Sequence, residues 1–222
     1  GDRVEPSLLA FQSELCAGLT DELEKRHKGS DRLNLYFGAR VESCDLETMK
    51  IATSGNPKVE NASFDLVIGC DGVNSVVRDA MVNACPSFTA AKEDLPGEFK
   101  VVRLSTAPPG VDPSSVSLIL PKKGSSGAFV EPTGNDGSCC ILFSGRGDTP
   151  ILKETQNKTA IVEELRGAFP KWEGIYEYIA GQLIAQKVPG TASSVVCNTY
   201  HFAGKAALAG DAAHATGGVS GQ

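Results

Sequence analysis

Residues 64–78 read Phe-Asp-Leu-Val-Ile-Gly-Cys-Asp-Gly-Val-Asn-Ser-Val-Val-Arg. The first seven form a compact apolar run of the kind found in a buried parallel strand. Asp71-Gly72 is a turn signal, and the valines that follow predict a helix that begins near Asn74 or Ser75. A strand, a turn and a helix in this order indicate an α/β fold.

The character of the sequence changes near Pro86. From there to residue 194, short β-like runs alternate with turn signals such as Asn135-Asp136-Gly137. This pattern predicts an antiparallel sheet, which a single helix at about residues 158–169 interrupts. No internal repeat is present.

The α/β pattern returns at residues 206–211, which predict a strand of small residues that ends in a Gly-Asp pair. We therefore predict an α/β (α+β) fold with one split domain. Residues 1–85 and 200–222 form this Rossmann-like domain, and residues 86–199 form an inserted, mainly antiparallel β domain.

The N-terminal part contains a further predicted helix between Pro6 and Arg26, because its apolar residues repeat at intervals of three and four. Alternating and aromatic residues then predict one or two short strands at residues 33–37 and 40–44. A loop at residues 54–57 turns the chain back.

Composition excludes several classes of function. The 222 residues carry a formal net charge of −6, whereas nucleic-acid binders usually present a basic face. No stretch approaches the roughly 18 apolar residues that a membrane span needs. The seven cysteines are odd in number and show no Cys-x-x-Cys spacing, so they indicate no zinc site, no disulfide framework and a reducing compartment.

The first motif that could bind a ligand is the turn at Asp71-Gly72. In open α/β sheets, ligands bind at the carboxyl ends of the strands. Gly72 permits close backbone approach, and the helix after it would offer free N–H groups to a phosphate. For the dipeptide alone a plain tight turn is the better explanation, but Ser75 and Arg78 at their present spacing favour the ligand hypothesis.

The second motif is Gly210-Asp211-Ala-Ala-His214. Asp211 can accept a hydrogen bond from a cofactor hydroxyl, and the alanines allow a flat ligand to lie close to the helix. His214 could be an acid/base catalyst, but a histidine in an alanine-rich turn is more often structural, and we favour that role.

Together, the two motifs resemble the internal fingerprints of the FAD-dependent aromatic hydroxylases, a family of flavoprotein monooxygenases. The resemblance runs through most of the chain. Within the family it is strongest to the kynurenine 3-monooxygenase branch, on residues 36–41, 64–81 and 197–202 as well as on the motifs.

The resemblance implies contacts to FAD. Arg3 is similar to an arginine near the FAD phosphates, and Val41 to a residue whose backbone meets the adenine side of the cofactor. Gly210 and Asp211 are similar to the pair whose aspartate binds the ribityl chain or ribose. Half of the expected site is absent, because no Gly-x-Gly-x-x-Gly turn precedes Arg3.

A second set of contacts is implied for Asp71, Gly72 and Arg78, which resemble the element that recognises the pyrophosphates of both FAD and NAD(P)H. The resemblance implies no catalytic side chain and no metal ligand. It implies that the flavin, reduced by NAD(P)H, reacts with O₂ to give a C4a-hydroperoxide that hydroxylates an aromatic small molecule.

Two alternatives to this function stay open. One is a related monooxygenase or epoxidase that acts on an isoprenoid. The other is a flavin-fold polypeptide that serves as a structural or regulatory subunit without turnover. Departures from the kynurenine branch at residues 118–122 and 217–220 lie near the expected substrate side, so kynurenine itself is not the indicated substrate.

We also expect the chain to be an interior piece of such an enzyme, inactive alone, with another chain covering its truncated edges. Membrane association is expected only through a segment after Gln222. The expected location is an intracellular reducing compartment, either the cytoplasm or an organelle, and the kynurenine branch implies the mitochondrial outer membrane.

Overall fold

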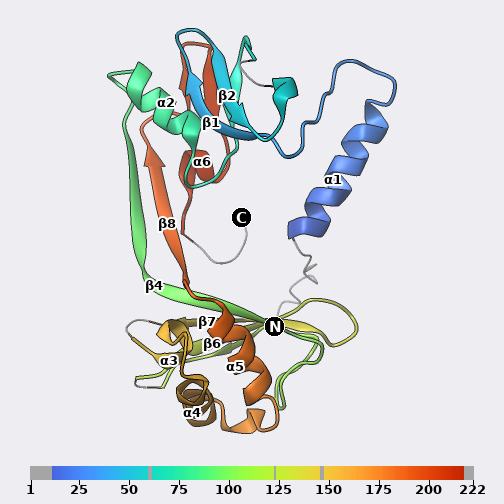
Figure 1. Ribbon diagram of the computed structural model, residues 1–222, viewed down its shortest axis with the longest axis vertical. Coiled ribbons are helices and arrows are strands. Elements are labelled where there is room, and N and C mark those ends of the chain that lie inside the picture. Colours follow the sequence, from blue (N-terminus) through green and yellow to red (C-terminus); the bar gives the residue numbers. More distant parts are fainter. Residues whose placement is uncertain (1–11, 60–61, 123, 146–147, 218–222) are drawn as a thin grey trace, which may run out of the picture. The chain divides into compact units, whose positions relative to one another are not determined.

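The computed structural model describes residues 12–59, 62–122, 124–145 and 148–217 (Figure 1). It confirms the predicted mixed α/β class. One compact unit holds the described parts of residues 1–29 and 96–191, and the other those of residues 30–95 and 192–222. The assignment of these units to cofactor and substrate stays a prediction.

The unit of residues 30–95 and 192–222 is built on a three-stranded sheet of order β3-β10-β9. Strand β3 (Val67–Gly69) runs parallel to β10 (Ala206–Leu208), and β9 (His201–Phe202) is antiparallel to β10. The parallel pair places the two strands before the Asp motifs in one sheet. The other elements of the unit are β1 (Arg40–Asp45), β2 (Lys50–Ser54), η1 (Pro57–Val59), α2 (Val76–Ala84) and α6 (Asp211–His214).

Helix α2 packs closely on this sheet, and a glycine makes the contact possible. A Cβ atom on Gly69 would lie 2.8 Å from Val77 Cβ and 3.0 Å from Leu208 Cδ2. Any larger residue would therefore push the helix away from the sheet. Met81 of α2 is fully buried in the same core.

The other unit contains most of a five-stranded antiparallel sheet of order β5-β6-β7-β4-β8. This confirms the antiparallel sheet predicted from the turn signals. The strands are β4 (Ala90–Leu104), β5 (Ser117–Ile119), β6 (Gly127–Pro132), β7 (Cys139–Gly145) and β8 (Gly190–Cys197). Strands β4 and β8 each contribute residues to both units.

Helices cover one side of this sheet, as Figure 1 shows for α3 (Pro150–Lys153), α4 (Lys158–Ala168) and α5 (Tyr176–Ala185). The core between them contains an aromatic cluster. Phe169 stacks on Trp172 of the 3₁₀ helix η2 (Pro170–Trp172), with ring centroids 4.3 Å apart, and Phe143 meets both rings edge-on. Such pairs add about 0.5–1.5 kcal/mol each to the effect of burial alone.

Two glutamines, Gln182 in α5 and Gln186 directly after it, satisfy backbone groups of β4. Gln186 accepts from Val101 N (3.1 Å) and donates to Val101 O (2.8 Å). Gln182, one helical turn earlier, makes the same pair of bonds to Arg103 (3.0 and 2.8 Å). The side-chain amides therefore satisfy the backbone N–H and C=O groups of Val101 and Arg103.

Some predicted elements were wrong. Residues 33–37 form no strand, and Tyr36 and Phe37 are exposed. Strand β2 was missed, because only the loop at residues 54–57 was predicted in this part of the chain. The segment around Tyr176 forms α5. The described part of this region therefore contains three α-helices, α3, α4 and α5, where the sequence predicted one.

The N-terminal helix exists as α1 (Gln12–Arg26), and the predicted start near Pro6 lies outside the described residues. Leu15, Leu19 and Leu23 of its apolar stripe are exposed. In the described ranges, no helix has the length and apolar character needed to cross a membrane. All seven cysteines are free thiols.

We predict that Gln186→Leu lowers the free energy of unfolding by about 1–3 kcal/mol, because the half-buried N–H and C=O of Val101 lose their partners. Chemical denaturation would measure the change. Gln156→Leu is the matched control, since Gln156 is exposed and no hydrogen bond of its side chain is found among the described residues. Equal stabilities of the two variants would contradict the role of Gln186.

Candidate functional site

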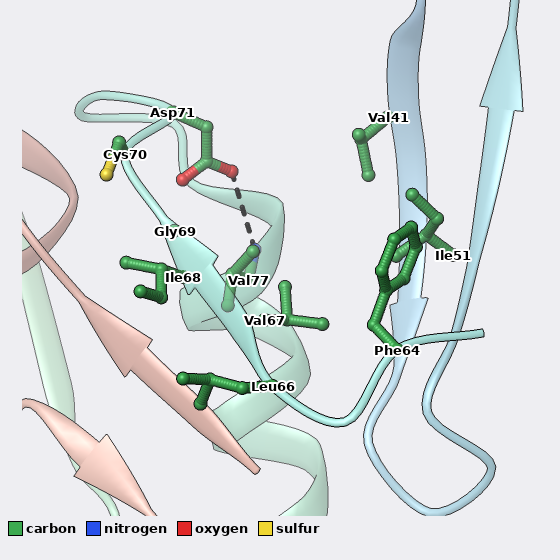
Figure 2. Close-up of a pocket in the computed structure, with 10 residues that line it drawn as sticks. All are labelled: Val41, Ile51, Phe64, Leu66, Val67, Ile68, Gly69, Cys70, Asp71 and Val77. Atoms are coloured by element: carbon green, nitrogen blue, oxygen red, sulfur yellow. Dashed lines mark hydrogen bonds between the residues drawn. The ribbon is translucent and has the colours of Figure 1, made fainter. Parts of the chain in front are cut away.

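A pocket of about 340 Å³ lies beside β3, and two predicted site residues line it (Figure 2). Val41 comes from β1, and Asp71 follows the end of β3. Figure 2 shows Val41, Ile51 and Phe64 close together, with Asp71 at the far end of β3. The remaining lining residues are Leu66, Val67, Ile68, Gly69, Cys70 and Val77. The pocket therefore joins a mainly apolar wall to a single carboxylate.

The carboxylate of Asp71 caps helix α2. Its Oδ2 accepts a hydrogen bond from Val76 N at 2.7 Å and a longer one from Val77 N at 3.5 Å. A negative charge at this position also interacts favourably with the positive end of the helix dipole. Asp71 is thus already engaged within the fold.

Ser75 completes the start of α2. It is fully buried, and its Oγ accepts from Arg78 N at 3.0 Å. The sequence predicted that this helix offers free N–H groups to a phosphate. That part of the prediction was wrong for Val76 and Arg78, because side chains of the same motif occupy these donors.

Gly72 has a φ of +77°, in the left-handed region that favours glycine. A Cβ atom at this position would meet nothing within 4 Å. The backbone conformation, rather than a close approach inside the chain, therefore explains the glycine. Space remains there for a ligand, so the predicted contact of Gly72 with a cofactor stays a prediction.

Arg78 is buried, with only 4% of its surface exposed. Its Nη1 donates to Ala212 O at 3.0 Å, and its Nη2 donates to Val73 O at 2.7 Å. The expected support of pyrophosphate recognition stays a prediction, and these contacts limit Arg78 to an indirect part in it. The positive charge also acts on buried Cys197, where it lowers the pKa of a thiol that burial raises more strongly.

Gly210 and Asp211 begin the short helix α6, directly after β10. Gly210 has φ 57° and ψ −142°, a conformation almost confined to glycine, and its carbonyl accepts from Ala213 N and His214 N. Asp211 is exposed. Among the described residues, no hydrogen bond or ion pair engages its carboxylate, which is therefore free to bind a ligand.

His214 is exposed, and its ring meets that of Tyr200 edge-on, with centroids 5.7 Å apart. This contact agrees with the structural role favoured from the sequence. Among the described residues, no group of three or more His, Cys, Asp or Glu could hold a metal ion. Arg3 lies outside the described residues, so its predicted phosphate contact stays a prediction.

The structure brings some of the predicted residues together. Val41 and Asp71 line one pocket, and Arg78 connects the turn after Asp71 to α6. Sequence reasoning missed Ile51 and the carbonyl of Ala212. The β-branched residues of 50–54, ahead of Gly55-Asn56-Pro57, were a signal for β2 and hence for Ile51. A backbone acceptor leaves no comparable signal.

The sequence matches the family model described as FAD binding domain over residues 7–222. It is 25% identical to kynurenine 3-monooxygenase from Salinispora arenicola over 186 residues, which cover 82% of this chain and 40% of that protein. It is 27% identical to violacein synthase from Chromobacterium violaceum over 195 residues, 84% of this chain and 44% of that protein. The chain thus spans about two fifths of the length of these curated relatives.

The fold of the chain is also similar to a solved structure. The chain is similar to a crystal structure of a variant of 2-methyl-3-hydroxypyridine-5-carboxylic acid oxygenase, with a TM-score of 0.62. The identity is 19%, and the match covers 93% of this chain and 51% of that chain. At this identity the likeness supports the fold alone.

We predict that Asp71→Ala lowers the stability of the flavin-free protein by about 0.5–2 kcal/mol, the usual cost of losing an N-terminal cap. Asp71→Asn should retain most of it, because the amide oxygen can still accept from Val76 N. Thermal unfolding without added flavin measures both variants. If Asp71→Ala unfolds at the wild-type temperature, the carboxylate does not act as the cap.

Proposed function

The chain belongs to the family of FAD-binding domains, and on this premise we propose that the protein carrying it is an FAD-dependent monooxygenase. In this proposal it uses NAD(P)H and O₂ to hydroxylate an aromatic small molecule. The observation that carries the proposal is the free, exposed carboxylate of Asp211 at the start of α6. It follows the carboxyl end of a parallel strand, where open α/β sheets bind their ligands.

The position of Asp211 follows from the parallel pairing of β3 and β10. Parallel strands end at the same edge of a sheet, and open α/β sheets bind ligands beyond that edge. Asp71 and Asp211 each follow one of these strands. Because Asp71 caps α2 and Asp211 has no partner among the described residues, Asp211 is the carboxylate available to a cofactor hydroxyl.

The described residues fit FAD in two respects. Asp211 would accept a charge-assisted hydrogen bond from a hydroxyl of the ribityl chain or ribose. The apolar pocket beside Val41 would receive a flat ring on the adenine side. When bound, FAD supplies the redox chemistry with NAD(P)H and O₂, while the side chains of this chain bind and orient it.

The proposed substrate is an aromatic compound without a more specific identity. Kynurenine 3-monooxygenase and violacein synthase, two relatives with different names, match the chain at similar identity. The departures at residues 118–122 and 217–220 also favour a substrate other than kynurenine.

A second candidate function is a flavin-fold subunit without turnover. The observation that favours it is the use of Asp71 and Arg78 in contacts within the fold. The visible spectrum of the purified protein distinguishes the two functions, because oxidised flavin absorbs near roughly 450 nm. A protein that stays colourless after incubation with FAD would refute the monooxygenase proposal.

We predict that Asp211→Ala weakens FAD binding by about one to two decades, because it removes a charge-assisted hydrogen bond of roughly 1.5–3 kcal/mol. Titration of the flavin-free protein with FAD measures the effect. Asp148→Ala, at an exposed aspartate of the other unit, is the control and should bind as the wild type does. An unchanged affinity in Asp211→Ala would remove the main support for the proposal.

A further inference from the structure

Arg78 contacts both of the segments that the sequence marks as functional. One terminal nitrogen donates to Val73 O in the turn after Asp71, and the other donates to Ala212 O in α6. With 4% of its surface exposed, the residue has almost no area left for a ligand. A direct contact with a pyrophosphate would require both bonds to break.

The surroundings of Arg78 favour a geometric role. Within the described ranges, no carboxylate lies within the 4.0 Å of an ion pair with its guanidinium. A buried charge is costly unless its donors are satisfied, and here two neutral carbonyls from different segments satisfy them. A planar guanidinium can hold two such acceptors in fixed directions, which a single ammonium group cannot do in the same way.

Helix α6 needs support of this kind. It has only four residues, and Ala213 N and His214 N both bond to the same carbonyl, that of Gly210. So short a helix has little stability of its own. Ala212 is fully buried and directly follows Asp211, so its carbonyl is a point at which the position of Asp211 can be fixed.

We propose that Arg78 is a positioning residue that fixes α6, and with it the carboxylate of Asp211, relative to the turn of residues 71–75. The guanidinium acts through the carbonyl of Ala212 and does not touch the ligand. By linkage, a ligand that orders α6 also orders this turn, and the reverse holds equally. The proposal deepens the proposed function but rests on it only for the flavin measurement.

The first experiment needs no flavin. The chain has three histidines, and the His214 ring lies against Tyr200, so its imidazole NMR signal reports the position of α6. Arg78→Lys should shift this signal. Arg166→Lys, at an exposed arginine of α4, is the matched control and should leave it unchanged. An unmoved His214 signal in folded Arg78→Lys overturns the proposal.

The second experiment compares FAD affinities of Arg78→Lys, Asp211→Ala and the double variant. We expect Arg78→Lys to bind FAD about tenfold more weakly, and the double variant to bind no more weakly than Asp211→Ala, because both changes act through Asp211. Additive losses would show that Arg78 contacts the cofactor independently and would overturn the proposal. If Asp211→Ala binds FAD normally, the proposed function fails, while the His214 measurement still decides the role of Arg78.

Should Arg78→Lys not fold, Gly210→Ala provides the reverse test in a chain that retains Arg78. Alanine does not readily adopt the backbone angles of Gly210, so α6 must shift. The backbone amide signal of Val73 should then move. A folded Gly210→Ala variant with an unchanged Val73 signal overturns the proposed coupling.

Discussion

The parallel pairing of β3 with β10 is the constraint from which the candidate site follows. It aligns Val67 with Ala206 and Gly69 with Leu208, although most of the chain separates the two strands. Parallel neighbours require a crossover connection. Here that connection contains α2 and all of the five-stranded sheet, so residues 96–191 of the other unit are inserted between the two strands, whereas its helix α1 precedes both of them. Both Asp motifs consequently reach the same edge of one sheet.

The two aspartates at this edge illustrate how position and availability differ. Each follows a parallel strand and precedes a helix, so the sequence assigns them the same kind of role. Asp71 has the N–H of Val76 at 2.7 Å and stabilises α2. Asp211 begins a helix in which the N–H groups of Ala213 and His214 donate to the carbonyl of Gly210, and its carboxylate stays exposed. A motif therefore identifies the edge, and the hydrogen bonds identify which carboxylate is available there.

Sequence patterns predicted the elements that local residues determine. The start of α2 at Ser75 and the antiparallel strands between turn signals were read from the residues alone. Residues 33–37 were misread, because alternating aromatic residues indicate a strand only where a partner strand exists, and Phe37 is exposed. The bond from Arg78 to Ala212 O could not be predicted, since every residue offers the same backbone carbonyl whatever its side chain. Long-range contacts to the backbone depend on the fold as a whole.

Among the described residues, each unit buries one cationic side chain, and a comparison of the two explains why an arginine suits its position. Lys100 of β4 is 1% exposed and donates to Leu183 O at 3.2 Å and Glu154 O at 3.5 Å. Burial lowers the pKa of Lys100, although Glu154 and Glu98 oppose the shift, so its charge is sensitive to its surroundings. A guanidinium remains charged in any environment of a folded protein, and its fork keeps separate donors for separate acceptors. Between the turn of residues 71–75 and α6, Arg78 therefore provides a connection whose charge does not depend on its surroundings and whose two terminal nitrogens bond to separate carbonyls.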